Sequence, residues 1–129
     1  MGDTARSRPR TAIIAFIVDA VLVTAFAALG RGSHARDATL LGLWETAWPF
    51  LAGLAIAWLL AVIWRRPLAI VRSGIPAWIG AAGLGMLLRW LTGGGTALPF
   101  VIVTVLVVGA LLLGWRAIVA LIQRLRRSA

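Results

Sequence analysis

Two charged residues lie inside apolar segments, where a charge is costly and marks either a partner or a function. Asp19 is nine residues beyond Arg10, which is about 13 Å along a helix. Arg116 is eight residues before Arg124, about 12 Å along a helix, counted from the same side of a membrane. We therefore expect Asp19 and Arg116 to form an intramembrane charge pair if the first and last apolar segments are neighbours.

This pair allows two interpretations. In the structural one, an ion pair sets the register of two helices, or Asp19 is an acid exposed to water. In the functional one, Asp19 relays protons or cations across the membrane. Because desolvation can cancel the attraction within a buried pair, pairing alone does not indicate a gain in stability.

A second set of polar residues falls near the opposite face of the membrane. It comprises Arg31, His34, Arg36 and Arg89. These side chains could bind an anion or a lipid headgroup, helped by the positive ends of nearby helices. The alternative is an ordinary interfacial belt of arginines whose charged heads reach toward water. His34 alone is more typical of a hydrogen-bonded loop residue than of a metal ligand.

The residue types exclude most enzyme chemistry within one chain. There is no Cys, His34 is the single His, and Asp and Glu together number four. A zinc site or a Ser–His–Asp triad needs more of these groups than the chain supplies. We therefore expect no catalytic residue, metal or cofactor, and we expect the protein not to be an enzyme.

The composition is typical of a chain dissolved in a lipid bilayer. Hydrophobic residues make up 61%, charged residues 13%, and the mean hydropathy is +0.96. Soluble domains are roughly 45–50% apolar and about 25% charged. The formal net charge of +9 comes with arginines that flank apolar segments. This placement favours anionic lipid headgroups as partners over nucleic acid.

Four apolar segments predict an all-α membrane protein with four transmembrane helices. They span about 11–30, 46–64, 75–92 and 97–122. Residues 11–122 then form one membrane domain between basic tails at 1–10 and 123–129. The start of the second helix stays open between residues near 38 and near 46.

The arginines predict the orientation. With the N-terminus inside, ten of thirteen lie on the inner side, and Arg31, Arg36 and Arg89 lie outside. This bias predicts cytoplasmic N- and C-termini in a multi-pass protein of the cell (cytoplasmic) membrane, the inner membrane of a prokaryote. A cleaved signal peptide is the competing interpretation of the first segment, and Asp19 argues against it because such segments are normally uncharged.

The motif Thr-Ala-x-Pro-Phe occurs twice, fifty residues apart, at 46–50 and 96–100. Its fixed positions are Thr46, Pro49, Phe50, Thr96, Pro99 and Phe100. Thr can cap a helix and Pro is tolerated in its first turn, so the motif is typical of a helix start. The repeat predicts two hairpins related by a pseudo-two-fold axis along the membrane normal. Chance is the alternative, and Pro49 would produce a kink if its helix begins near residue 38.

Small residues recur at every fourth position in the two middle segments. They are Gly53, Ala57 and Ala61 in one, and Ala77, Ala81 and Gly85 in the other. This spacing lets helix backbones approach closely in lipid. We expect packing within the chain, with the face of a homodimer as the alternative.

Longer phrases carry a resemblance to a known family. They are GRGSH (30–34), TAWPFLAGLAIAW (46–58), GMLLRWLTGGGTALPFVIV (85–103) and LLLGWR (111–116). Over roughly residues 13–116 the chain resembles the prokaryotic membrane proteins called domain of unknown function 3054. The resemblance implies a four-helix inner-membrane protein and no particular activity.

Two functions from different classes remain. One is a channel or transporter for a small ion or solute, acting as a dimer, with Asp19 and the outer arginines along its path. The other is a non-transporting scaffold or accessory subunit whose polar residues only hold helices together. The small size, the repeat and the intramembrane acid favour transport. A water-filled cavity that reaches Asp19 would support it, whereas a fully paired Asp19 in a dry bundle would support the scaffold.

Overall fold

A computed structural model of the chain describes residues 9–31 and 39–128, and these residues contain helices and turns but no strand. The main helices are α1 (Pro9–Arg31), α2 (Leu40–Leu60), α3 (Ile75–Trp78), α4 (Gly85–Leu91) and α5 (Leu98–Ser128). Short helical turns, η3 (Ile63–Arg65), η4 (Ile70–Gly74) and η5 (Ile79–Leu84), complete the order. Four helices, 9–30, 40–60, 70–91 and 98–128, are long and apolar enough to cross a membrane.

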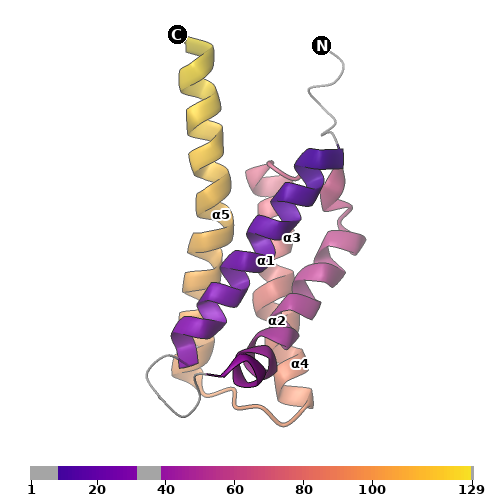
Figure 1. The fold of residues 1–129 in the computed structure, drawn as a ribbon, viewed down its shortest axis with the longest axis vertical. Coiled ribbons are helices and arrows are strands. Elements are labelled where there is room, and N and C mark those ends of the chain that lie inside the picture. The colour runs from indigo at the N-terminus through magenta and orange to yellow at the C-terminus, as the bar shows by residue number, and fades with distance from the viewer. Residues whose placement is uncertain (1–8, 32–38, 129) are drawn as a thin grey trace.

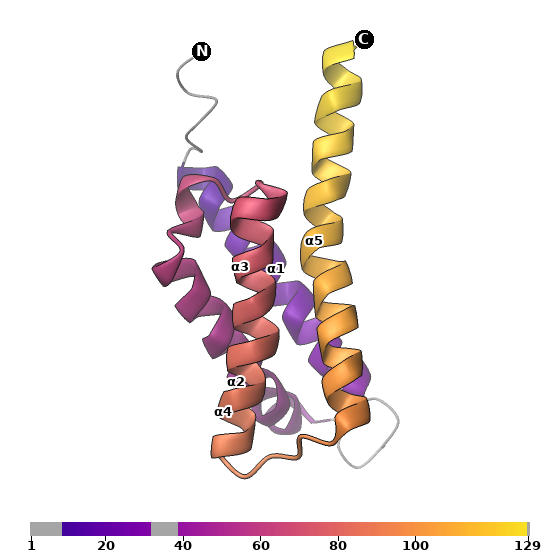
Figure 2. The same ribbon diagram turned by 180° about the vertical axis from the view of Figure 1, so that it is seen from behind.

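The four long helices form a closed ring of neighbours. α1 packs against α2 and α5, α2 packs against the helix 70–91, and that helix packs against α5. The start of α1 and the end of α5 lie at the same end of the bundle (Figures 1 and 2), which we call the termini end. The neighbouring position of α1 and α5 meets the condition under which Asp19 and Arg116 can approach.

The second helix takes the earlier of its two expected starts, and it ends four residues before the expected residue 64. α2 begins at Leu40, where the Oγ1 atom of Thr39 caps the helix by accepting from the backbone N–H of Gly42 at 2.9 Å. It ends at Leu60, and Val62 adopts a left-handed backbone conformation before the turn η3. Because the helix starts early, Pro49 lies inside it. This is the alternative for which a kink was expected.

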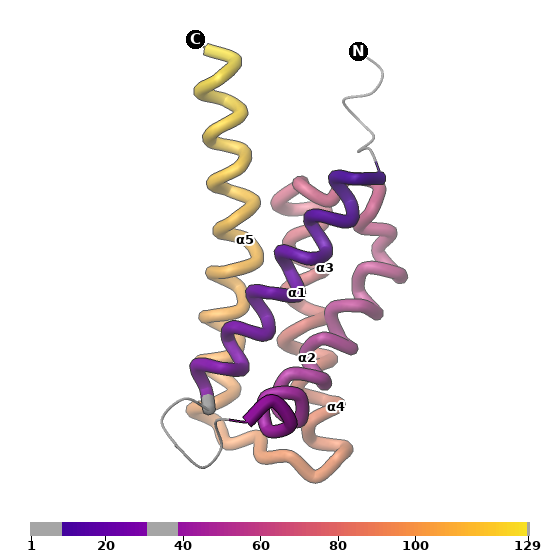
Figure 3. The backbone as a smooth tube through the Cα atoms, viewed as in Figure 1, coloured from indigo at the N-terminus to yellow at the C-terminus, as the bar shows by residue number. Residues whose placement is uncertain are grey.

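The direction of α2 changes along its length. Its first turns are seen end-on, whereas its later turns run along the bundle (Figure 3). Pro49 lies within this helix and supplies no backbone N–H, so it accounts for the bend. The Thr46 motif is therefore not a helix start.

The third helix begins five residues earlier than expected. It runs over 70–91 rather than 75–92, and two of its stretches, 70–74 and 79–84, have π-helical hydrogen bonding. Pro76 lies in the second turn of this continuous helix. α1 and α5 also extend past the expected 11–30 and 97–122, and α5 continues through the basic segment 123–128. With 31 residues, α5 is about 46 Å long and projects beyond the other helices at the termini end (Figure 1).

Glycines allow α2 and the helix 70–91 to pack closely. A Cβ atom on Gly53 would collide with the backbone of Gly80 and Gly85, and one on Gly80 would collide with Ala57. A Cβ atom on Gly85 would meet the Cδ1 atom of Phe50 at 2.5 Å. The small-residue spacing thus does serve packing within the chain, as expected.

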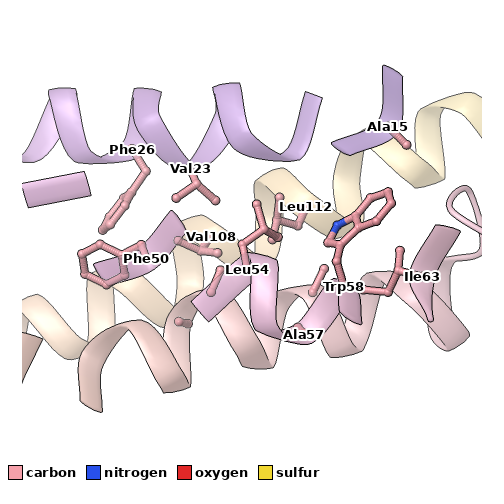
Figure 4. Packing of buried hydrophobic residues seen from close by; sticks show 13 residues of the cluster. Ala15, Val23, Phe26, Phe50, Leu54, Ala57, Trp58, Ile63, Val108 and Leu112 are labelled. Carbon is pink, nitrogen blue, oxygen red and sulfur yellow. The ribbon is translucent and has the colours of Figure 1, made fainter. Parts of the chain in front are cut away.

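The apolar core runs along the inside of the ring (Figure 4). Phe26 and Phe50 lie toward one end of it, and Trp58 and Ile63 toward the other. Val108 and Leu112 reach it from α5, and both are at most 1% exposed. Many large apolar side chains on the outer faces are exposed, which is the arrangement expected when lipid rather than water surrounds the helices.

Candidate functional site

Asp19 lies on the buried face of α1. Ala15, Asp19, Val23 and Phe26 follow one another at intervals of three or four residues, and all are buried. The helical period therefore directs the carboxylate into the bundle together with the apolar side chains of the same face. No part of Asp19 is exposed.

Arg116 lies on the matching face of α5. Thr104, Val108, Leu112 and Arg116 recur every fourth residue, and all are buried. The Cδ atom of Arg116 passes beside Gly74, where a Cβ atom would lie 3.2 Å from it. The guanidinium therefore reaches the interior between α5 and the first turn of the helix 70–91.

Asp19 and Arg116 form a bidentate ion pair. Nη1 of Arg116 donates to Oδ1 of Asp19 at 2.9 Å, and Nη2 donates to Oδ2 at 2.8 Å. Neither side chain is exposed. Such a planar fork is the strongest geometry that a carboxylate and a guanidinium can adopt, because two charge-assisted bonds form in parallel. The two residues that the depth estimate brings together are thus in direct contact.

Two tryptophans complete the hydrogen bonding of the carboxylate. Nε1 of Trp58 donates to Oδ2 of Asp19 at 3.0 Å, and Nε1 of Trp115 donates to Oδ1 at 2.8 Å. With Arg116, the carboxylate accepts four hydrogen bonds, about the number that its lone pairs allow. We call these four residues, Asp19, Trp58, Trp115 and Arg116, the carboxylate cluster.

Two further N–H groups of Arg116 bind backbone carbonyl groups. Nε donates to Pro67 O at 2.8 Å, and Nη1 also donates to Leu112 O at 3.0 Å. The guanidinium carbon lies 4.7 Å from the ring centroid of Trp115. Since Pro67 lies in the connection after α2, Arg116 joins that connection to α1 and α5. No buried side-chain N or O atom among the described residues lacks a hydrogen-bond partner.

Sequence reasoning missed both tryptophans. Neither Trp58 nor Trp115 was expected to contact Asp19. One signal was available: a buried carboxylate needs several donors, and side-chain N–H groups are rare inside apolar segments. Trp115 is adjacent to Arg116 in the chain, but a sequence does not show that both side chains of such a pair can turn toward one acceptor.

The second set of polar residues does not form a described site. The side chain of Arg31, at the end of α1, and the residues His34 and Arg36 lie outside the described residues. Arg89 turns back over the following turn, where its Nε donates to Gly95 O at 2.6 Å and its guanidinium lies 4.8 Å from the ring centroid of Phe100. Within residues 9–31 and 39–128, no group of three or more His, Cys, Asp or Glu could hold a metal ion.

The repeated motif brings two phenylalanines together. The rings of Phe50 and Phe100 have centroids 6.2 Å apart, and both contact Phe26, at 5.7 and 6.1 Å. In the second copy, Pro99 is in the first turn of α5, and Thr96 lies in the loop just before that helix. Thr46 is buried in the middle of α2, where its hydroxyl donates to Gly42 O at 3.2 Å. The two copies of the motif therefore occupy different positions in their helices.

The fold and the carboxylate cluster define an all-helical protein with the four apolar helices of a multi-pass membrane protein. The chain belongs to the family described as Protein of unknown function (DUF3054), whose family model matches residues 16–119. This match confirms the family resemblance, and its range includes every member of the carboxylate cluster. No curated protein and no solved structure matches the chain.

Proposed function

We propose that this protein is a non-transporting, non-enzymatic scaffold or accessory protein of the cytoplasmic membrane. The observation that carries the proposal is the saturation of Asp19: its carboxylate is unexposed and accepts hydrogen bonds from Trp58, Trp115 and Arg116. A cation or proton relay requires a carboxylate that can exchange its partners with the permeating species. This carboxylate would first have to lose charge-assisted bonds inside an apolar bundle.

Two hollows in the described part of the bundle also favour this function over transport. One groove lies along α1 beside Leu51, and another lies between α5 and the helix 70–91. Apart from Thr24 in the first groove, the lining of both is apolar, and neither lining includes a charged residue or a member of the carboxylate cluster. Transport, the function favoured by the sequence, would need an assembly such as a homodimer that opens a polar path to Asp19.

The carboxylate cluster supports a structural role because it ties separate segments together. Asp19 comes from α1, Trp58 from α2, Trp115 and Arg116 from α5, and Pro67 from the connection between α2 and the third helix. A fully satisfied polar network in a low-dielectric interior can define one arrangement of helices, because alternative registers would leave its members unpaired. We assign the cluster this positioning role.

Flux into liposomes tests the proposal. Wild-type protein and Asp19→Asn are reconstituted at equal density, and protons, alkali cations and small anions are screened against protein-free liposomes. We expect both proteins to match the protein-free rate. Flux in the wild type that Asp19→Asn abolishes would establish transport and overturn the proposal. Trp58→Phe, which removes one donor and retains the ion pair, serves as a second variant if Asp19→Asn does not fold.

We further propose that both termini face the cytoplasm, as the arginine bias indicates. Because the chain has no Cys, single cysteines give an unambiguous readout. The substitution Gly95→Cys places one in the turn between α4 and α5, and Ser128→Cys places one at the end of α5. A membrane-impermeant maleimide added to intact cells should label Gly95→Cys and leave Ser128→Cys unlabelled until the cells are opened. The reverse pattern would invert the orientation.

A further inference from the structure

An apolar groove runs between α5 and the helix 70–91, and the carboxylate cluster plays no part in it. Its volume is about 450 Å³, within the range of small-ligand sites. Trp78 forms one wall and donates from Nε1 to Val105 O at 2.9 Å. Gly109 makes room for this indole, since a Cβ atom there would lie 2.8 Å from it. The groove is therefore a shaped depression with an ordered wall.

The length of the groove corresponds to one leaflet. Along α5 its lining extends from Val105 to Ala117, about 18 Å at the rise of an α-helix. Half of the hydrocarbon core of a bilayer is about 15 Å thick. Ile70, the first residue of its helix, lines the groove at the termini end. An acyl chain that enters from that end would thus lie along the groove for most of its length.

An exposed arginine stands above the termini end of the groove. Arg124 is seven residues after Ala117, two helical turns, and therefore lies above it on the same face of α5. Its side chain is exposed. The part of α5 that carries Arg124 projects beyond the bundle (Figure 2), so this charge lies farther from the core than the apolar lining.

We propose that this groove binds one acyl chain of an anionic phospholipid, with Arg124 facing its phosphate. The apolar lining matches the acyl chain, and the positive charge of Arg124 matches the headgroup. This proposal does not depend on the proposed function, because Arg124 does not belong to the carboxylate cluster.

Charge complementarity favours a lipid over a second copy of the chain. A second copy of the same orientation that docked its α5 into this groove would bring its own Arg124 toward the Arg124 of the first. Like charges at that position would oppose the contact, whereas an anionic headgroup would neutralise them. Small residues on this face, such as Gly114 and Ala117, leave space that a flexible acyl chain can fill.

Quenching of tryptophan fluorescence tests the proposal. The protein is reconstituted into phosphatidylcholine vesicles that contain either brominated phosphatidylglycerol or brominated phosphatidylcholine at equal mole fraction. Trp78→Phe identifies the part of the quenching that comes from the groove. We expect the Trp78 component to be quenched at lower mole fractions of the anionic lipid than of the zwitterionic lipid.

Matched variants assign this preference to the site. Arg124→Gln should weaken the apparent affinity for the anionic lipid about fivefold, the effect of one basic residue near a membrane surface. Arg126→Gln makes the same change of charge on the opposite face of α5 and should leave the affinity unchanged. Gly114→Leu, where the structure leaves space for a side chain, should fill the groove and abolish Trp78-specific quenching, whereas Gly83→Leu, outside the groove, should not.

Three outcomes would overturn the proposal. Equal quenching by both brominated lipids would show that the groove has no preference for an anionic lipid. Loss of the Trp78-specific quenching when soluble glycerol phosphate is added would show that the site binds a headgroup alone. Efficient oxidative cross-linking of Gly114→Cys between copies, with no headgroup dependence of quenching, would identify a second chain as the occupant.

Discussion

The carboxylate of Asp19 and the guanidinium of Arg116 meet edge to edge, although 97 positions separate them in the chain. Both groups are unexposed, and their contact joins the first helix of the ring to the last. Each group has therefore lost its hydration water and is hydrogen-bonded to the other group instead, with two indoles around the carboxylate and backbone carbonyls around the guanidinium. The energetic consequences of this pairing can be measured by removing one partner at a time.

Single substitutions within this pair should be much more harmful than the double substitution. Asp19→Leu or Arg116→Met leaves one buried charge without its partner, and each should lower the free energy of unfolding by about 3–5 kcal/mol. Asp19→Leu combined with Arg116→Met should cost clearly less than the sum, because no unpaired charge remains. Unfolding in mixed micelles measures all three. Additive losses would show that the two charges do not stabilise each other.

The two indole donors should each contribute to stability through Asp19. Trp58→Phe and Trp115→Phe remove one hydrogen bond to a charged group, and each should cost about 1.5–3 kcal/mol. Trp90→Phe is the matched control, because Trp90 is 61% exposed. Thermal unfolding in detergent compares the three variants. Equal melting temperatures for all three would mean that the indole N–H groups are not important to the carboxylate.

Close packing between α2 and the third helix should tolerate no additional methyl group. Gly53→Ala places a Cβ atom against the backbone of Gly80 and Gly85, which cannot move aside without shifting a helix. We expect a loss of about 1–3 kcal/mol in unfolding free energy. At Gly83, on the same helix as Gly80, the nearest atom would be 4.0 Å from the new Cβ. Gly83→Ala should therefore be neutral or slightly stabilising, and a larger loss there than at Gly53 would contradict the packing described.

Two of the three glycines in the turn between α4 and α5 differ in their requirement for glycine. Gly93 has a φ of +85°, in the left-handed region, whereas Gly95 has an ordinary φ and no atom within 4 Å of an added Cβ. Gly93→Ala should cost about 1–2 kcal/mol because the new side chain is strained in that conformation. Gly95→Ala should have almost no effect. Unfolding of the two variants in the same detergent measures the difference. Equal stability would show that the left-handed conformation at Gly93 does not require glycine.

Apolar length and charge placement were sufficient to predict the class of fold. Runs of about 20 apolar residues admit few structures other than membrane-spanning helices, since every backbone polar group must be satisfied within the chain. The matching depths of Asp19 and Arg116 likewise follow from a constant helical rise. Helix ends were less predictable: the apolar run that contains α2 does not reveal that Thr39 caps it or that a left-handed Val62 follows it.

By itself, the sequence determined the four helices and the matching depths of Asp19 and Arg116, because these depend on composition and on periodicity along single segments, and its longer phrases carried the family resemblance. Only the tertiary structure decided that Trp58 and Trp115 complete the carboxylate cluster, that Pro67 accepts from Arg116, and that Pro49 lies within a bent helix. The reason is directional. A hydrogen bond forms only when donor and acceptor from different helices point at each other, and the rotation of each helix about its axis is set by how all four pack together.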